Sequence, residues 1–194
     1  TSVGAKINLA NRREESKVAT LTVFTTRADT IFGVDFMVVA PEHEIVKDIT
    51  SAAQNAEVEK YLKYVESRSE VDRMAEVKKI TGAFTGAFAV NPFNGREIPI
   101  WISEYVLAGY GTGAIMAVPC GDERDHKFAK HFNLPVTNII GKHYDGSEAN
   151  PTYDATLENS GFLNGMLMKD AIEAVVQKLE EDGLGKRQVN YKMR

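Results

Sequence analysis

Residues 111–125 read GTGAIMAVPCGDERD, and this stretch decides how the chain around it folds. A glycine-rich approach leads into an apolar run over residues 114–118, which predicts a buried strand. Pro119 ends that run, and the carboxylates of Asp122 and Asp125 stand where a helix N-cap and its third helical residue would lie. The stretch therefore predicts a strand, a turn and a helix that begins at Asp122.

The carboxylate of Asp125 has two interpretations. It lies on the same helical face as the apolar Phe128 and Phe132, where a carboxylate is costly unless it is paired or hydrogen-bonded. One interpretation makes Asp122 and Asp125 a capping pair that suits the helix dipole. The other has Asp125 facing a pocket and holding a substrate ammonium. Both can hold together, with Asp122 capping the helix and Asp125 binding.

A second stretch, residues 24–30 (FTTRADT), follows an alternation of apolar and hydroxyl-bearing side chains that is typical of a half-buried strand. Three hydroxyls, a guanidinium and a carboxylate stand within six positions: Thr25, Thr26, Arg27, Asp29 and Thr30. Each has an ordinary explanation, as a strand former, a turn cap or half of a surface ion pair. Their concentration favours a functional site. Together the two stretches offer a threonine-lined floor and an acidic wall, which suit a cationic amine next to a hydrolysable carbonyl.

The rest of the pattern mixes strands and helices without strict alternation. Further strands are expected at residues 36–40, 82–90, 98–102 and 136–140, and an Asn-Gly turn at residues 91–95. Helices are expected around residues 58–65 and 172–179, with capping boxes Ser67/Glu70 and Ser69/Asp72 for a further short helix. Residues 142–160 are polar and turn-rich, which predicts a surface excursion. The class is therefore α+β, a mixed sheet or β-barrel with peripheral helices.

Composition bounds the class of protein. The chain has 194 residues with 43% apolar and 26% charged residues, as expected for one soluble domain. A formal charge of −4 argues against a general nucleic-acid binder, so an RNA partner would need phosphate contacts from outside this chain. No apolar run is long enough for a membrane span and no leader is evident, so a cytoplasmic location is expected. Both ends look cut, as in a domain excised from a larger protein.

Several familiar sites are disfavoured. The GYGTG of residues 109–113 lacks the dinucleotide spacing and precedes a strand rather than a helix. The four histidines, at positions 43, 126, 131 and 143, show no paired-ligand spacing, so no metal site is expected. Cys120, the single cysteine, rules out an internal disulfide, fits a reducing compartment, and is more often inert than nucleophilic beside a buried strand.

Three segments closely resemble the editing insertion of bacterial-type leucyl-tRNA synthetases: residues 24–34 (FTTRADTIFGV), 40–43 (APEH) and 110–128 (YGTGAIMAVPCGDERDHKF). The flanks resemble the linking strands to a catalytic domain, so residues 1–194 are expected to be a single editing domain with links at about residues 1–9 and 186–194. The resemblance implies a β-barrel core that hydrolyses the ester between a wrong amino acid and the terminal adenosine of leucine tRNA.

The same resemblance implies the partners and cofactors. The partners are the 3′ terminal adenosine of mischarged tRNA(Leu), non-cognate amino acids and the rest of the synthetase in cis, with no membrane. No cofactor is expected in this domain, since ATP and Mg²⁺ belong to the absent catalytic domain, which ligates leucine to its tRNA.

It also implies residue roles. Asp125 would bind the α-ammonium of the aminoacyl group, while Thr25 and Thr26 contact the substrate and orient water or stabilise the oxyanion. Thr30 would narrow the side-chain pocket so that leucine fits badly. The remaining expected substrate-binding residues, lining the pocket or seating the tRNA end, are Phe24, Arg27, Leu107, Tyr110, Met116, Val118 and Asp122.

This chain departs from the family pattern at two positions. Ala28 stands where the family usually has proline, which frees the backbone dihedral φ of the loop, and Gly121 stands where it usually has histidine. These departures motivate one alternative, a non-catalytic module that binds an RNA end or an amino acid. A second alternative, an editing domain of isoleucyl or valyl type, is disfavoured by the segments TIFGV, APEH and MAVP followed by DERD.

Overall fold

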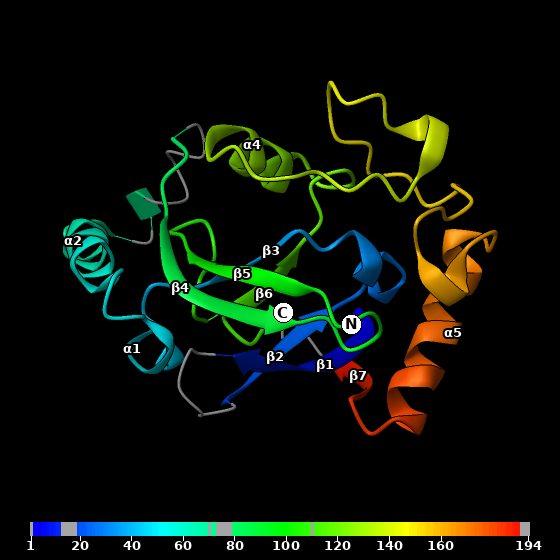
Figure 1. Ribbon diagram of the computed structural model, residues 1–194, viewed down its shortest axis with the longest axis horizontal. Coiled ribbons are helices and arrows are strands. Elements are labelled where there is room, and N and C mark those ends of the chain that lie inside the picture. Colours follow the sequence, from blue (N-terminus) through cyan, green and yellow to red (C-terminus); the bar gives the residue numbers. More distant parts are fainter. Residues whose placement is uncertain (1, 13–18, 70, 73–78, 110, 191–194) are drawn as a thin grey trace.

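The computed structural model describes residues 2–12, 19–69, 71–72, 79–109 and 111–190 (Figure 1). Their strands are β1 Ser2–Arg12, β2 Ala19–Thr25, β3 Phe36–Val39, β4 Ala83–Val90, β5 Glu97–Ile102, β6 Ala114–Ala117 and β7 Gly185–Asn190. Their helices are α1 Ile45–Ile49, α2 Asn55–Glu66, α4 Glu123–His131 and α5 Met168–Glu181, with short 3₁₀ helices η1 Ala28–Gly33, η2 Gly141–His143 and η3 Gly161–Leu163.

The strands form one mixed sheet in the order β2-β1-β4-β5-β3-β6, with β7 paired to β1. The pair β3–β5 is parallel and the other ladders are antiparallel, which confirms the α+β class. The closed barrel is not confirmed. The end strands β2 and β6 pack against each other, but no ladder joins them among the described residues. Strand β6 ends at Ala117, and the next N–H, that of Val118, bonds to a carboxylate instead of a strand.

The sheet curls around one hydrophobic core. Alternate side chains from six strands point into it, including Ile7, Leu21, Val39, Ala87, Ile100 and Ala114. Strand β3 is buried on both faces, because Phe36 and Val38 pack instead under α4, where Phe36 stacks on Phe128 at 5.0 Å. In Figure 1, α4 lies across one side of the sheet, while α1 and α2 flank one end and α5 the other.

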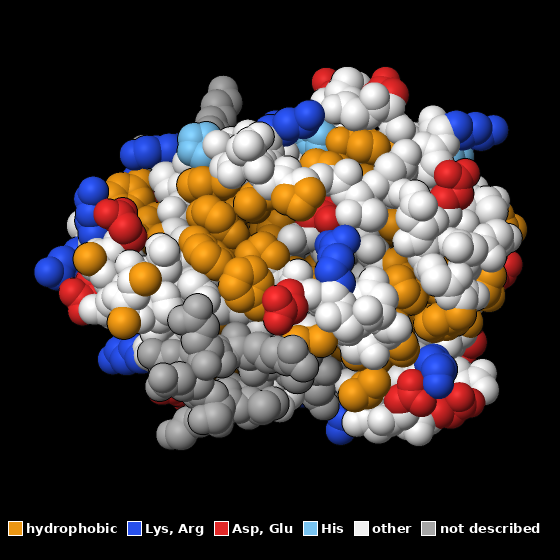
Figure 2. Space-filling model, viewed as in Figure 1, with side chains coloured by type: hydrophobic (Ala, Val, Ile, Leu, Met, Phe, Trp, Pro, Cys, Tyr) orange, Lys and Arg blue, Asp and Glu red, His pale blue; other side chains and the backbone are white. Residues whose placement is uncertain are grey.

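Strand β1 also pairs with β7 over Ser2–Asn190 to Ile7–Gly185, so the two segments expected to link to a catalytic domain run side by side. The outward faces of β4 and β5 carry partly exposed apolar side chains (Figure 2). Phe84 contacts both Phe88 and Trp101 there, and Trp101 also contacts Phe128 of α4. No helix in the described part of the chain is long and apolar enough to cross a membrane.

One strand prediction is wrong. Residues 136–140 join no ladder, although Ile139 and Ile140 are buried. The N–H of Thr137 donates to the Asp35 carboxylate at 2.7 Å, and the N–H of Ile140 donates to Asn138 Oδ1 at 3.0 Å. Side chains therefore satisfy the donors that a neighbouring strand would otherwise take.

The other predicted elements are present with small shifts at their ends. The reciprocal bonds of the Ser69/Asp72 capping box are formed, whereas Glu70 of the overlapping box lies outside the described residues. The prediction of a surface excursion is confirmed only in part. Residues 142–160 carry few regular elements, yet Ala155 and Leu157 are fully buried in the core.

Candidate functional site

A cavity of about 260 Å³ opens where β2, β6 and the start of α4 meet the loop at residues 150–153. This volume is slightly below the range of small-molecule pockets, which are typically about 300–1,000 Å³. Its wall mixes apolar and polar side chains: Thr25, Arg27, Thr30, Met116, Val118, Cys120, Gly121, Asp122, Asp125, Ile139, Ile140, Asn150, Pro151, Thr152, Tyr153 and Met168.

The two stretches that the sequence singled out meet at this cavity. Seven of the expected site residues line it: Thr25, Arg27, Thr30, Met116, Val118, Asp122 and Asp125. Three others, Phe24, Thr26 and Leu107, do not line it, and Tyr110 lies outside the described residues. The alternation of side chains along β2 explains why Thr25 lines the cavity and Phe24 does not. Thr25 shares a face with buried Val23, whereas Phe24 lies on the opposite face beside Gly4.

Asp125 is a buried carboxylate in the cavity wall, with 5% of its surface exposed. Its Oδ2 accepts a hydrogen bond of 2.9 Å from the N–H of Val118, and its Oδ1 accepts one of 3.0 Å from the Tyr105 hydroxyl. Burial, and then the negative charge of Asp122, raise the pKa of Asp125 to about 7, against the pull of its two donors. The site therefore holds a desolvated carboxylate that gains from a cationic partner.

Asp122 caps helix α4. Its Oδ1 accepts hydrogen bonds from the N–H groups of Arg124 at 2.9 Å and Asp125 at 3.1 Å. Both sequence interpretations thus hold in part, since Asp122 is the cap and the Asp125 side chain turns to the cavity. The reciprocal bond of a capping pair is not made, because the N–H of Asp122 donates to the carbonyl of Val118.

The two cavity threonines differ in what their hydroxyls do. Thr25 Oγ1 accepts a bond of 2.9 Å from the N–H of Arg27, which leaves the Thr25 proton for a group in the cavity. Thr30 Oγ1 instead donates to the carbonyl of Arg27 at 2.8 Å. Thr30 is 6% exposed and lines the cavity, so it contributes mainly bulk to the cavity wall.

Arg27 ties the threonine side of the cavity to the loop opposite. Its guanidinium makes a two-pronged ion pair with the fully buried Asp29, at 3.0 Å and 2.9 Å. It also donates to the carbonyl of Thr152 at 3.2 Å and lies 4.0 Å from the centre of the Tyr153 ring. The local pair that the sequence offered as a surface contact is therefore a buried anchor.

Thiol and metal chemistry find little support. Burial raises the pKa of the Cys120 thiol to about 11, so it carries almost no thiolate near neutral pH. Within the described ranges, no group of three or more histidine, cysteine, aspartate or glutamate side chains is arranged to hold a metal ion.

Sequence reasoning missed the far wall of the cavity. Asn150, Pro151, Thr152 and Tyr153 come from the loop that was expected to be a surface excursion, and Met168 begins α5. This loop has no periodicity that would have pointed to the cavity. The partly exposed ring of Tyr153 is the sole hint among these residues, since it interrupts a polar run.

The two atypical positions both lie near the cavity. Ala28 is the first residue of η1, a position at which proline is ordinarily tolerated. Gly121 lines the cavity, and a Cβ built on it would meet its nearest neighbours at 3.9–4.0 Å. A side chain at position 121 therefore has room.

Comparison with known proteins gives a consistent match. The family model described as the editing domain of leucyl-tRNA synthetase matches residues 1–180. A leucine–tRNA ligase of Christiangramia forsetii is 50% identical over 194 residues, which is 100% of this chain and 20% of that relative. One from Amoebophilus asiaticus is 45% identical over 199 residues, 100% of this chain and 21% of the relative. The chain thus spans about one fifth of the length of these curated relatives.

The fold agrees with the sequence matches. A crystal structure of the ternary complex of Agrobacterium radiobacter K84 agnB2 LeuRS, tRNA and LeuAMS superimposes with a TM-score of 0.75 at 30% identity. The match covers 100% of this chain and 20% of that one.

Proposed function

The chain belongs to the editing-domain family of leucyl-tRNA synthetases, and on that premise we propose that it hydrolyses mischarged aminoacyl-tRNA(Leu) after transfer. Water attacks the ester carbonyl carbon, the bond to the ribose oxygen breaks, and that oxygen takes up a proton. The products are the non-cognate amino acid and free tRNA. The observation that carries the proposal is the buried carboxylate of Asp125, turned into a cavity that the threonine stretch also lines.

The charge at Asp125 matches the substrate. An α-amino group titrates near pH 8, so an aminoacyl ester presents an ammonium at neutral pH. Binding that ammonium offsets the desolvation of Asp125 and lowers its pKa from about 7, so the ion pair forms at physiological pH. The pair fixes the ester carbonyl relative to the rest of the wall, which is what an activated ester chiefly needs for hydrolysis.

The threonines supply the remaining functions. Thr25 has a proton to donate to the attacking water or to the developing oxyanion. Thr30 narrows the pocket for the side chain, beside Met116 and Val118. One methylene in a pocket provides about 1–3 kcal/mol of discrimination, so a synthetase benefits from this second sieve.

The remaining expected roles rest on the resemblance. Thr26, which the resemblance implies acts with Thr25 on the water or the oxyanion, does not line the cavity. In the proposal it contacts, with Phe24, Leu107 and Tyr110, parts of the tRNA end that extend beyond the cavity. The adenosine and the rest of the synthetase are the partners, and ATP and Mg²⁺ serve the ligation site elsewhere. The leucyl identity of the family match disfavours an isoleucyl or valyl type.

The test is deacylation by the full-length synthetase. We expect the wild type to hydrolyse tRNA(Leu) charged with methionine, which has a straighter side chain than leucine, and to spare leucyl-tRNA(Leu). Asp125→Ala removes a charge-assisted contact worth about 2 kcal/mol or more, so deacylation should fall at least about 30-fold. Leucine ligation is the control for folding. A wild type that binds the mischarged tRNA without hydrolysing it would establish the non-catalytic module instead.

A further inference from the structure

Tyr105 lies behind Asp125, just after β5, and belongs to none of the groups assigned above. Its hydroxyl donates a 3.0 Å hydrogen bond to Asp125 Oδ1, while the N–H of Val118 holds Oδ2. We propose that Tyr105 is a positioning residue for editing, holding the Asp125 carboxylate so that its remaining lone pairs meet the α-ammonium of the substrate. This inference rests on the proposed hydrolysis.

The ring of Tyr105 is held by the same helix that carries Asp125. The Phe128 ring lies 5.8 Å from it, centre to centre, and the Arg124 guanidinium carbon lies 6.0 Å from its centre. These residues flank Asp125 along α4, one before it and one a turn after it. Phe128 in turn stacks on Phe36 of β3 in the core under α4. The hydroxyl of Tyr105 is thus aimed at the carboxylate by a ring that has little room to turn.

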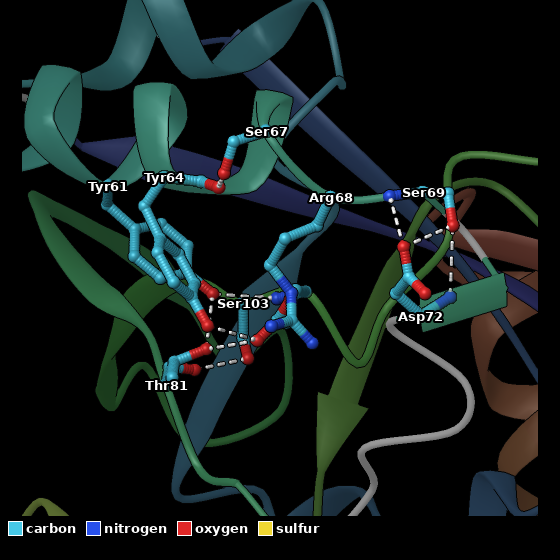
Figure 3. Close-up of polar contacts among 9 residues, drawn as sticks. Tyr61, Tyr64, Ser67, Arg68, Ser69, Asp72, Thr81 and Ser103 are labelled. Carbon is cyan, nitrogen blue, oxygen red and sulfur yellow. Dashed lines mark hydrogen bonds and ion pairs between the residues drawn. The ribbon is translucent and has the colours of Figure 1, made fainter.

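The backbone that presents Tyr105 is anchored from the other side, by a polar cluster between α2 and the approach to β4 (Figure 3). The N–H of Glu104 donates to the Tyr61 hydroxyl at 2.9 Å. Ser103 Oγ donates to the carbonyl of Thr81 at 2.6 Å, and Thr81 Oγ1 donates to Glu104 Oε1 at 2.8 Å. The two residues before Tyr105 are therefore fixed in place, independently of the cavity.

Arg68 completes this cluster from the end of α2. Its Nε lies 2.9 Å from Glu104 Oε2, and Glu104 is almost fully buried, so the ion pair is shielded from solvent. The Tyr64 hydroxyl reaches Glu104 Oε1 at 3.4 Å, a longer contact. Tyr64 therefore offers a matched control, a tyrosine of the same cluster whose hydroxyl does not contact Asp125.

The hydrogen bond also has an electrostatic effect. A donor to a carboxylate favours its charged form, and both Tyr105 and Val118 act in that direction on the pKa of Asp125. Burial and the negative charge of Asp122 raise this pKa, whereas the positive charge of Arg124 lowers it modestly. Burial and the neighbouring carboxylate raise the pKa of Tyr105 itself well above 10, so its hydroxyl stays a donor throughout the working range.

Across the cavity the charged group is Arg27, whose guanidinium is engaged by Asp29. Among the described residues, the facing wall therefore adds no carboxylate that competes with Asp125 for the Tyr105 proton. Loss of the Tyr105 hydroxyl should therefore have two effects: it should destabilise the charged form of Asp125, and it should leave the carboxylate less firmly oriented.

The experiment compares Tyr105→Phe with Tyr64→Phe in the full-length synthetase. Tyr105→Phe keeps the ring contacts and removes one oxygen. We expect kcat/KM for deacylation of methionyl-tRNA(Leu) to fall about tenfold at pH 7, with the acid limb of its pH profile moving up by about one unit. The larger part of the loss should be in KM, because ammonium binding precedes reaction. Tyr64→Phe should leave the acid limb of the pH profile where it is in the wild type. Leucine ligation should be unchanged in both variants.

A double-mutant cycle with Asp125→Asn separates positioning from general structure. In the Asp125→Asn background, Tyr105→Phe should change kcat/KM less than twofold, because the carboxylate it acts through is gone. An undiminished effect there, or an unshifted acid limb in the single variant, would overturn the proposal. If instead Asp125→Ala deacylates as fast as the wild type, Asp125 does not bind the ammonium and the role of Tyr105 falls with it. A wild type that does not deacylate the mischarged tRNA would refute the proposed function, which is a different result.

Discussion

Asp122 Oδ1 accepts a hydrogen bond of 3.1 Å from the backbone N–H of Asp125, so one aspartate of the pair caps helix α4 and presents the other to the cavity. The same closeness has a cost. The charge of Asp122 is the largest electrostatic contribution, after burial, to the raised pKa of Asp125. Capping and binding are therefore coupled through these two side chains.

Asp122→Asn should separate the two effects. Asparagine caps helices about as well as aspartate, so the free energy of unfolding should change by less than about 0.5 kcal/mol, whereas Asp122→Ala should lower it by about 1 kcal/mol. Removing the charge should lower the pKa of Asp125, shifting the acid limb of deacylation down by about 0.5 pH unit or less, since Asp122 is partly exposed. Urea denaturation and a pH–rate profile check both parts. An upward shift would contradict this account.

Asp125→Asn should make the fold more stable at high pH. The folded carboxyl has a pKa of about 7 against an ordinary value of 3.8, so the folded state binds the proton more tightly than the unfolded chain. The free energy of unfolding of the wild type therefore falls as pH rises from about 4 to about 7, and the loss is complete above that. Asparagine carries no charge; its amide oxygen can accept the hydrogen bond from the N–H of Val118, and its NH2 group can donate to the Tyr105 hydroxyl oxygen.

The expected gain for Asp125→Asn is on the order of 2–4 kcal/mol at pH 8 and close to zero at pH 4. Denaturation of the 194-residue chain at both pH values measures it. A variant that is less stable than the wild type at pH 8 would show that the carboxylate is not desolvated.

Much of this site could be predicted from the sequence, because short-range spacing fixes it. The inward face of α4 follows from the positions of Asp125 and Phe128 at helical spacing, and the cap follows from Asp122 after a proline. The alternation along β2 also predicts which side chains face the core. Thr25 lies on the same face of the strand as Leu21 and Val23, whereas Phe24 lies on the other face. Because the three threonines were considered as one cluster, this difference between the two faces of the strand was overlooked.

The errors come from long-range contacts. Residues 136–140 (VTNII) predict a strand because four of the five are β-branched, but the carboxylate of Asp35, more than one hundred residues earlier, accepts the hydrogen bond from the N–H of Thr137. Arg27 holds the far wall of the cavity in place, because its guanidinium contacts Thr152 and Tyr153, which are distant in the sequence. Such pairings depend on how the sheet curls, and no local pattern encodes them.

Thr30→Ala should relax the discrimination against leucine. Thr30 lines the cavity with little exposure, so the truncation enlarges the side-chain pocket. Hydrolysis of correctly charged leucyl-tRNA(Leu) should rise by about tenfold or more, from the 1–3 kcal/mol that a methylene-sized change provides. Thr30→Val keeps the branched bulk but not the bond to the carbonyl of Arg27, so it should still spare leucine. Equal leakage in both variants would assign the effect to the lost hydrogen bond.

Gly121→His should be accommodated and should aid editing. The nearest atoms to a Cβ at this position, on Val118 and Asn150, lie at ordinary contact distance. The free energy of unfolding should change by less than about 0.5 kcal/mol, and an added imidazole in the cavity wall should raise kcat/KM for deacylation about two- to tenfold, through one hydrogen bond of about 0.5–1.5 kcal/mol. Gly121→Ala is the control for the Cβ alone. A drop in kcat/KM for the histidine variant with alanine unchanged would show that the imidazole blocks the ligand.

The most direct measurement is a crystal structure of the full-length synthetase with a non-hydrolysable aminoacyl-adenosine analogue. We predict that the analogue occupies the cavity with its α-ammonium about 2.8 Å from a carboxylate oxygen of Asp125 and its carbonyl oxygen facing Thr25. An analogue bound in the cavity with its ammonium beyond hydrogen-bonding distance of Asp125, or bound outside the cavity altogether, would contradict the account.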